Sequence, residues 1–383
     1  MRRGSKWVTV AGRRVIFACL LASVAAYGQG LSDQRPQMAE ELFRNVQVLK
    51  GIPVNEFLGI MGFFSASLGK SCVDCHNSDS GWENYVADTN RNKQIARAMI
   101  RMATEINKSF FGGRQVVTCY SCHRGGPHPK VTPNLTALYS PPSETEPDDV
   151  VQPARSVTSA GQILDKYIQA VGGAPRLASL ASFAAKGVSV GYGLDAEKRP
   201  VEIFAKAPNQ RAAIVHAENG DTVTIYDGRS GWIAAPNLPV PVLPLTGGDL
   251  EGARLDANLS FPPEIKQAIS GWRVGVPSDI EDRVVQVLQG SSGDDSFATL
   301  YFDSESGLLL RQLRYANSPV GRMPTQIDYS DYREVGGIKM PFRWTVTWLD
   351  GRETFELSEV QLNAPLEASR FARPAPSPAR APR

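Results

Sequence analysis

A pair of C-x-x-C-H segments constrains this chain more than any other feature. They are CVDCH at residues 72–76 and CYSCH at residues 119–123. This spacing suits a porphyrin held by two thioether bonds, because the two cysteines reach adjacent pyrrole rings and the next residue directs an imidazole at the iron. The sequence therefore predicts two covalent haem c groups per chain. The expected tethers are Cys72, Cys75, Cys119 and Cys122, and the expected axial ligands include His76 and His123.

Three other kinds of site use paired cysteines. A redox-active pair would need a neighbouring βαβ pattern, which the sequence lacks, and would not need a histidine after both pairs. Zinc could bind four thiolates, but residues 76–118 make a long separation, and zinc leaves both histidines unexplained. Two disulfides are the default in an exported chain, again with no role for the histidines. These alternatives stay open, with haem favoured.

The N-terminus has the layout of a secretory signal. Five Arg and Lys residues precede an apolar run over 15–26, and small residues follow before Gln29. The apolar run is too short to span a bilayer comfortably. We expect a signal peptide at 1–28, removal of Cys19 with it, and a periplasmic protein. A retained anchor is the alternative, which would bring the protein to a membrane surface.

The stretch 31–125 shows helical periodicity. Apolar residues recur at helical spacing from Pro36 to Gly51, then from Pro53 to Gly69, and again from a cap at Asp88 to Gly112. A helix therefore precedes each C-x-x-C-H segment, which makes a twofold repeat with one haem site per unit. The aromatic residues Trp82 and Tyr85 could pack over a porphyrin edge, although ordinary core packing is equally consistent with them.

The rest of the 383-residue chain has a different pattern. Residues 126–158 are rich in proline and acidic residues, as in an interdomain linker. After a short helix at 162–171, strand patterns over 159–372 alternate with turn dipeptides such as Asp350-Gly351, with one more helix near 264–270. We expect an α + β two-domain protein in which a helical dihaem domain (31–125) precedes an antiparallel, curved half-barrel, and a disordered tail at 373–383. The net charge of +2 favours no nucleic-acid partner.

The sixth iron ligand is not fixed by the motifs. Met61, Met99 and Met102 lie on the two helices that precede the attachment segments. A methionine thioether would close the coordination sphere and raise the potential, whereas an open position would admit oxygen or substrate. Methionine on an apolar helix face is more often core packing, so spacing alone slightly favours the packing role.

Three stretches closely resemble the cytochrome c subunit of photosynthetic reaction centres. They are MGFFSASLGKSCVDCH (61–76), ARAMIRMATEIN (96–107) and VVTCYSCHRG (116–125). The resemblance covers about residues 40–126 and implies electron transport. Position by position, it implies Met61 and Met99 as axial ligands, with Met102 in reserve. The family protein carries four haems, one of them ligated by two histidines, whereas this chain has two attachment segments and a Ser-Phe-Phe-Gly stretch at 109–112 in place of the family's extra histidine.

The strand-turn-strand runs at 300–315, 331–344 and 357–371 weakly resemble the half-barrel of periplasmic lipoprotein-carrier and lipoprotein-sorting proteins. This resemblance implies an apolar ligand in the C-terminal domain, or a docking role for it. We find no catalytic pattern in residues 159–372 and expect no enzyme. The interpretation is an electron carrier with redox-protein partners; the alternative is a lipid- or small-ligand-binding module with haem-based redox sensing.

Overall fold

The computed structural model describes residues 35–76, 84–135, 151, 153–154, 158–192, 196–292 and 296–375. Contacts divide the chain into Met1–Pro36 and Gln37–Arg383, and every helix and strand of the described residues lies in the second unit. The predicted signal peptide, Trp82 and the tail beyond residue 375 lie outside the described residues.

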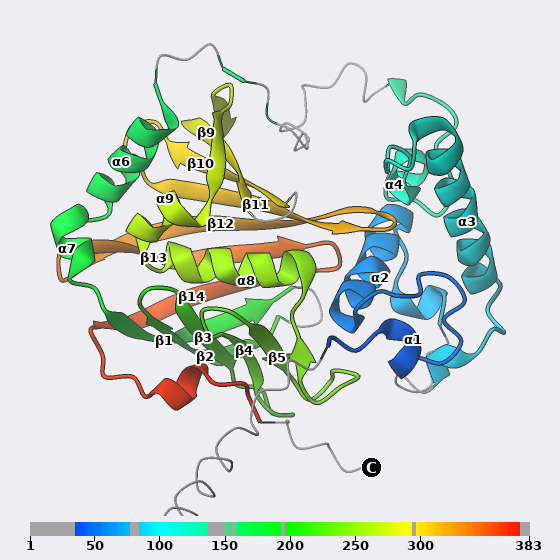
Figure 1. Ribbon diagram of the computed structural model, residues 1–383, viewed down its shortest axis with the longest axis horizontal. Helices are drawn as coiled ribbons and strands as arrows, with labels where there is room; N and C mark the ends of the chain where they lie inside the picture. Colours follow the sequence, from blue (N-terminus) through cyan, green and yellow to red (C-terminus); the bar gives the residue numbers. More distant parts are fainter. Residues whose placement is uncertain are drawn as a thin grey trace, which may run out of the picture. The chain divides into compact units, whose positions relative to one another are not determined.

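Among the described residues, one antiparallel sheet of 14 strands dominates the C-terminal part of the chain (Figure 1). Its first six strands are β1 (Ser182–Gly191), β2 (Lys198–Lys206), β3 (Gln210–Val215), β4 (Thr222–Tyr226), β5 (Gly231–Ala234) and β6 (Leu243–Pro244). The others are β7 (Ser270–Val274), β8 (Ser278–Ile280), β9 (Arg283–Ser292), β10 (Ser296–Asp303), β11 (Leu309–Ser318), β12 (Gly321–Val335), β13 (Ile338–Trp348) and β14 (Gly351–Leu362). The order is β6-β5-β4-β3-β2-β1-β14-β13-β12-β11-β10-β9-β7, and β8 also pairs with β9.

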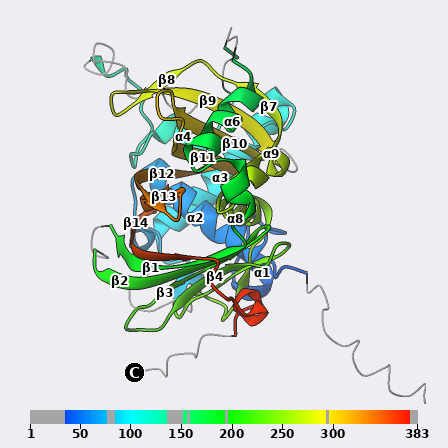
Figure 2. The same ribbon diagram turned by 90° about the vertical axis from the view of Figure 1, so that its left-hand side faces the viewer.

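Most neighbouring strands are joined by short turns, as the turn dipeptides predict. Trp348 pairs with Gly351 across the β13–β14 turn, and Val335 pairs with Ile338 across Gly336-Gly337. The hairpin predicted near Asp350-Gly351 and the strand-turn-strand run at 331–344 are confirmed. Figure 2 shows that the sheet is strongly curved. The predicted α + β class and the curved antiparallel sheet are therefore confirmed.

Helices cover one face of the sheet and complete its core. They are α6 (Ala160–Ala170), α7 (Ala174–Ala178), α8 (Gly247–Leu259), the 3-10 turn η4 (Pro262–Glu264) and α9 (Ile265–Ala268). Leu255, Phe261 and Ile265 join a buried cluster with sheet residues such as Leu300 and Phe302. The chain's own side chains therefore fill this apolar layer. A last 3-10 turn, η5 (Ala368–Phe371), buries Phe371 against β2, β3 and β4.

The N-terminal helices are α1 (Ala39–Leu42), α2 (Val54–Leu68), α3 (Arg91–Phe111) and α4 (Cys119–His123), with 3-10 turns η1 (Cys72–Asp74) and η2 (Asn84–Val86). The limits of α2 confirm the prediction, because Pro53 precedes it and Gly69 ends it with φ 59°. The helix expected from Pro36 to Gly51 is wrong beyond one turn. Asn45 and Leu49 have positive φ, and the side chain of Glu40 accepts the amide of Gly51.

For the start of α3 and for the predicted linker, the sequence-based prediction agrees with the structure only in part. The helix predicted from Asp88 begins at Arg91, because Asn90 is its N-cap and Asp88 instead forms ion pairs with two residues of α3. Within the described part of 126–158, Pro153 pairs with Gly275 beside β7. The boundaries of the two predicted domains stay predictions. No helix of the described residues is long and apolar enough to cross a membrane.

Candidate functional site

The first attachment segment, CVDCH, is a single tight turn that follows directly after α2. Ser71 caps it, because the carboxylate of Asp74 accepts hydrogen bonds from the backbone amide (2.7 Å) and the hydroxyl (2.9 Å) of Ser71. These bonds lower the pKa of Asp74. The His76 amide donates to Cys72 O at 2.9 Å, which closes the turn. Both cysteines are free, with Cys72 exposed and Cys75 half-buried.

The start of α3 fixes this turn from the other side. The side-chain amides of Asn90 and Asn92 both donate to the backbone oxygen of Asp74, at 3.1 and 2.8 Å. Asn90 also accepts the Asn92 amide and thereby caps α3. The first attachment segment is therefore anchored through its backbone, which leaves its cysteine and histidine side chains available.

His76 lies against the ring of Tyr85. The two ring centroids are 4.3 Å apart and the planes differ by 23°, which is a stacked arrangement. The Nδ1 atom of His76 is buried and has no hydrogen-bond partner in the described part of the chain. Burial lowers the pKa of His76, and the charge of Lys93 adds to this effect. The neutral imidazole is favoured, which is the form that binds a metal.

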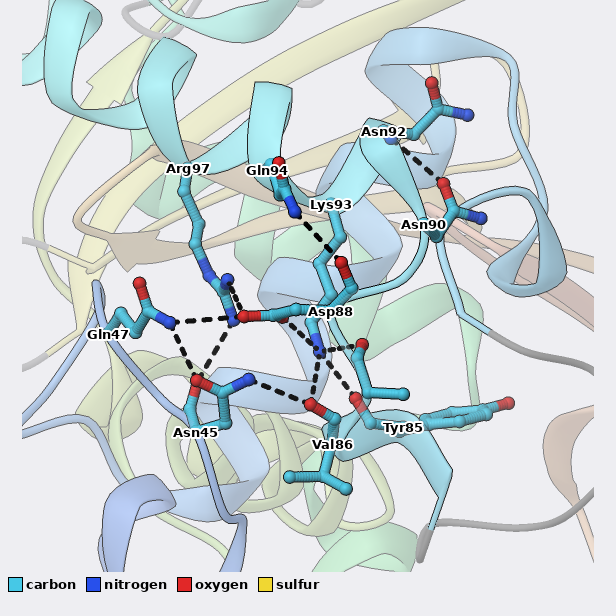
Figure 3. A network of polar contacts seen from close by, with 11 residues as sticks. Asn45, Gln47, Tyr85, Val86, Asp88, Asn90, Asn92, Lys93, Gln94 and Arg97 are labelled. Carbon is cyan, nitrogen blue, oxygen red and sulfur yellow. Dashed lines mark hydrogen bonds and ion pairs between the residues drawn. The ribbon is translucent and has the colours of Figure 1, made fainter.

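A polar network around Asp88 holds the segment that carries Tyr85 (Figure 3). The Lys93 ammonium donates to the backbone oxygens of residues 85, 86 and 87, at 2.7, 3.3 and 2.9 Å. Arg97 and Lys93 pair with the Asp88 carboxylate at 2.8 and 3.3 Å, and Asn45 donates to Val86 O at 2.8 Å. Hydrogen bonding by Arg97 is the largest cause that holds the pKa of Asp88 well below its usual value. The network thus fixes the backbone behind the ring that contacts His76.

The second attachment segment, CYSCH, is the regular helix α4. Thr118 and Ser121 form a reciprocal capping pair, in which each hydroxyl accepts the other's backbone amide, at 3.3 and 3.0 Å. Arg124 ends the helix with φ 49°. Cys122 is exposed, whereas Cys119 is half-buried and burial raises the pKa of its thiol.

His123, at the end of α4, has a partner for its ring. Its Nδ1 lies 3.1 Å from the backbone oxygen of Gly126. A hydrogen bond from Nδ1–H to a carbonyl leaves the lone pair of Nε2 free to bind a metal. This is the usual arrangement of a metal-binding histidine. The turn after α4 is tied to α2, because the Gly125 amide donates to Ser67 O at 3.0 Å. Gly69 is required here, since a Cβ on it would collide with the Gly125 oxygen.

Asn107 connects α3 to the backbone just before α4. Its side-chain oxygen accepts the amides of Val116 and Val117 at 3.1 and 2.9 Å, and its nitrogen donates to Val117 O at 2.7 Å. Asn107 is only 7% exposed, so this side chain has exchanged water for backbone partners. It gives the second attachment segment a fixed position relative to α3.

The three candidate methionines have different surroundings. Met61 is half-buried on α2, beside a cluster that contains Ile60 and Phe63. Met99 and Met102 are 37% and 48% exposed on α3. Ile95 and Phe110 share the exposed apolar side of α3 with them, and such a side presents the kind of surface against which a porphyrin packs. The described residues contain no cluster of His, Cys, Asp and Glu suited to a metal ion.

This donor set fits a c-type haem at each segment. The thiols at each segment are free, the imidazole of each is held by the fold, and the buried Nδ1 of His76 is an unpaired polar atom. Sequence reasoning missed the residues that organise the two segments, above all Asn107 and the Asp88 network. The signal for Asn107 was present, because it ends the stretch ARAMIRMATEIN by which the resemblance was recognised.

Comparison with known proteins gives the same family as the motifs. Residues 2–159 match the family model of the photosynthetic reaction centre cytochrome c subunit. The subunit from Rubrivivax gelatinosus is 28% identical over 132 residues, 33% of this chain and 35% of the relative. That from Thermochromatium tepidum is 33% identical over 103 residues, 26% and 24% of the two chains. The chain thus spans about a quarter to a third of these relatives, and the similarity recognised in its N-terminal part is confirmed.

Solved structures with low sequence identity match about half of the chain. A LolA superfamily protein from Nitrosomonas europaea has a TM-score of 0.41 and 15% identity, over 56% of this chain and 98% of its own. An outer membrane lipoprotein-sorting protein domain from Vibrio parahaemolyticus has a TM-score of 0.37 and 10% identity, over 50% and 89%.

Proposed function

We propose that this protein is an electron carrier with two covalently bound c-type haems, one at each C-x-x-C-H segment. The observation that carries the proposal is the pairing of two complete segments with a match to a cytochrome c family over residues 2–159. The haem group supplies reversible one-electron chemistry. The chain's own residues tether it, orient it and set its surroundings.

Each proposed site uses its residues in the same roles. Two cysteines hold the porphyrin edge, and His76 or His123 binds the iron through Nε2. Met61 and Met99 are the proposed sixth ligands, with Met102 in reserve for the second site. A thioether in the sixth position favours ferrous iron and raises the potential. A closed coordination sphere suits an electron carrier rather than an enzyme that binds substrate at iron.

The test is a mass measurement on the protein purified from a host that attaches haem outside the cytoplasm. We expect the intact mass to exceed that of the polypeptide by two haems, with haem staining that survives denaturing electrophoresis. An unmodified mass, or zinc in the elemental analysis, overturns the proposal. Carbon monoxide gives a second test, because six-coordinate haems resist it, and rapid binding to the reduced protein would indicate an open iron and an enzyme.

Export to the periplasm belongs to the same proposal. Its support is the signal-like N-terminus, and N-terminal sequencing of the mature protein should find a chain that begins near Tyr27 or Gln29. Electron donors and acceptors are then one-electron redox proteins of that compartment. The apolar ligand suggested for the C-terminal region stays a prediction from sequence.

A further inference from the structure

The helix that carries Met61 contacts the C-terminal half of the chain as well as its N-terminal neighbours α1 and α4. Figure 1 shows the start of α8 beside α2, and the long β11–β12 hairpin reaching α2 and α4. Val320 and Met323 of that hairpin share a buried cluster with Ile60 and Phe63 of α2. The helix therefore depends on residues more than 180 positions later in the sequence.

The closest connection is a hydrogen-bonded clamp at the first turn of α2. Asn55, only 6% exposed, donates from Nδ2 to Asp249 Oδ2 at 2.8 Å and to Thr246 O at 3.3 Å. The Thr246 hydroxyl lies 2.7 Å from both Asn55 Oδ1 and Glu56 Oε1, and it donates to one of them at a time. All polar atoms of the Asn55 side chain are thereby satisfied.

The clamp is formed at the expense of a local interaction. Thr246 is the N-cap of α8, a position where a threonine hydroxyl ordinarily accepts an amide of its own helix. Here the side chain makes no such cap bond, because it faces α2 instead. Gly247 also permits close approach, since a Cβ there would lie 2.8 Å from Glu56 Oε1. The start of α8 is thus shaped to contact α2.

The remainder of α2 is fixed at two further places. At Gly62 its backbone lies against the β13–β14 turn, where an added Cβ would lie 3.0 Å from the Asp350 carboxylate. At its C-terminal end Ser67 O accepts the Gly125 amide, next to the second attachment segment. Met61 lies between the clamp and this end, roughly 9 Å along the axis from Asn55.

We propose that the Asn55–Thr246–Asp249 clamp positions the Met61 thioether for the first haem. The β-sheet module, formed by β1–β14 with α6–α9, would thereby set the potential of that haem. This inference rests on the proposed function. A continuous hydrogen-bonded helix transmits a displacement of its first turn to Met61, and the sulfur–iron bond responds to small displacements. The module therefore acts as a positioning element for one haem in preference to the other.

The experiment is a redox titration of the full-length holoprotein and four variants. Asn55→Asp places a second carboxylate next to that of Asp249, and the repulsion between the two groups breaks the clamp. Asn55→Asp with Asp249→Asn restores the contact between positions 55 and 249 with donor and acceptor exchanged, but not the bond to Thr246 O. Thr246→Val removes only the hydroxyl and is the milder variant if the first does not fold. Glu251→Gln is the matched control on α8, because Glu251 pairs with Arg254 at 2.8 Å within its own helix.

The first haem's wave is identified as the one that Cys72→Ser with Cys75→Ser removes. We expect Asn55→Asp and Thr246→Val to change the reduction equilibrium of that haem at least twofold and to weaken its sulfur-to-iron charge-transfer band. The exchanged pair should return both toward wild type, and Glu251→Gln should change neither. A lower melting temperature with an unchanged wave and band, or equal shifts of both waves, overturns the inference. A wild-type protein without haem overturns the proposed function instead.

Discussion

The two attachment segments share a sequence pattern and differ in how the fold holds them. CVDCH is a tight turn tied by its backbone to the start of α3, and His76 lies against Tyr85 with Nδ1 unpaired among the described residues. CYSCH is a capped helix tied to α2 and α3, and His123 Nδ1 contacts the Gly126 oxygen at 3.1 Å. The motif sets the covalent chemistry, whereas the surroundings of each histidine differentiate the two proposed haems.

Two physical effects separate the reduction potentials of the two proposed haems, and both act in the same direction. A hydrogen bond from Nδ1–H makes an imidazole a stronger donor, which stabilises ferric iron at His123. Near His76, Lys93 and Arg97 share one carboxylate, Asp88, and the excess positive charge favours ferrous iron. We therefore expect the first haem to have the higher potential.

The largest expected effect comes from removing one pair of cysteines. Cys72→Ser with Cys75→Ser should abolish one titration wave, and Cys119→Ser with Cys122→Ser should abolish the other, with one haem lost from the intact mass each time. If the first pair removes the lower-potential wave, the expected order of potentials is wrong. Loss of both haems from either double variant would contradict independent sites.

Exchange of the sixth ligands should give the next largest effect. Imidazole in place of a thioether stabilises ferric iron, so Met61→His should lower one wave and Met99→His the other. The shift should reach at least a tenth of the roughly 0.8 V range over which axial ligands set haem potentials. Met61→Leu and Met99→Leu are the controls, because they remove the sulfur without adding a donor. If a wave stays unchanged in its histidine variant, the substituted methionine is not the sixth ligand of that haem.

Asn107→Ala should affect the second segment selectively. The change leaves the amides of Val116 and Val117 and the Val117 oxygen without partners, and lowers the free energy of unfolding by about 2–4 kcal/mol. Denaturant titration measures this loss. Asn107→Asp is the control, since it keeps the two accepting contacts and should lose less. An equal loss in both variants would mean that the donated bond to Val117 dominates.

The sequence predicted local features of this fold well and long-range ones poorly. Pro53 and Gly69 fix the limits of α2 locally, and Asp350-Gly351 fixes a hairpin turn. Helix α8 was missed because three of its 13 residues are glycines, which lower helix propensity, although it contains neither proline nor a β-branched side chain. The helix expected before Gly51 ends at Leu42, and at Asn45 contacts with Val86 and Arg97 override the periodicity.

The candidate site also combines features that a local sequence pattern predicts with features that depend on long-range contacts. The proposed tethers and histidines of each site lie within five residues, so spacing alone predicts them. The contacts that distinguish the sites join distant residues, such as Asn45 with Val86 or Asn55 with Asp249, and no local pattern encodes such a pair. Tyr85 was noticed only as an aromatic residue of uncertain role; its stacking on His76 depends on the Asp88 network.

Asp88→Asn tests that network through pH. The pKa of Asp88 is held well below its ordinary value of 3.8, so the charged carboxylate contributes stability that is present above about pH 4 and is lost as pH falls through the lower, folded-state pKa. At pH 7 the variant should melt roughly 2–4 °C below wild type, and the difference should shrink below about pH 4. A difference that persists unchanged at pH 2 would show that charge is not the cause.

The smallest expected effect is that of Met102→Leu, which discriminates between the two methionines of α3. Ile100 lines a hollow with Asn107 and Cys119, and at 100° per residue Met99 lies roughly 100° from Ile100 around the helix and Met102 roughly 160°. Met99 is therefore closer to the second segment's side, and a leucine at 102 conserves volume on an exposed face. Both potentials and both charge-transfer bands should stay at wild-type values. If Met102→Leu instead abolishes one band while Met99→Leu preserves it, the ligand is Met102.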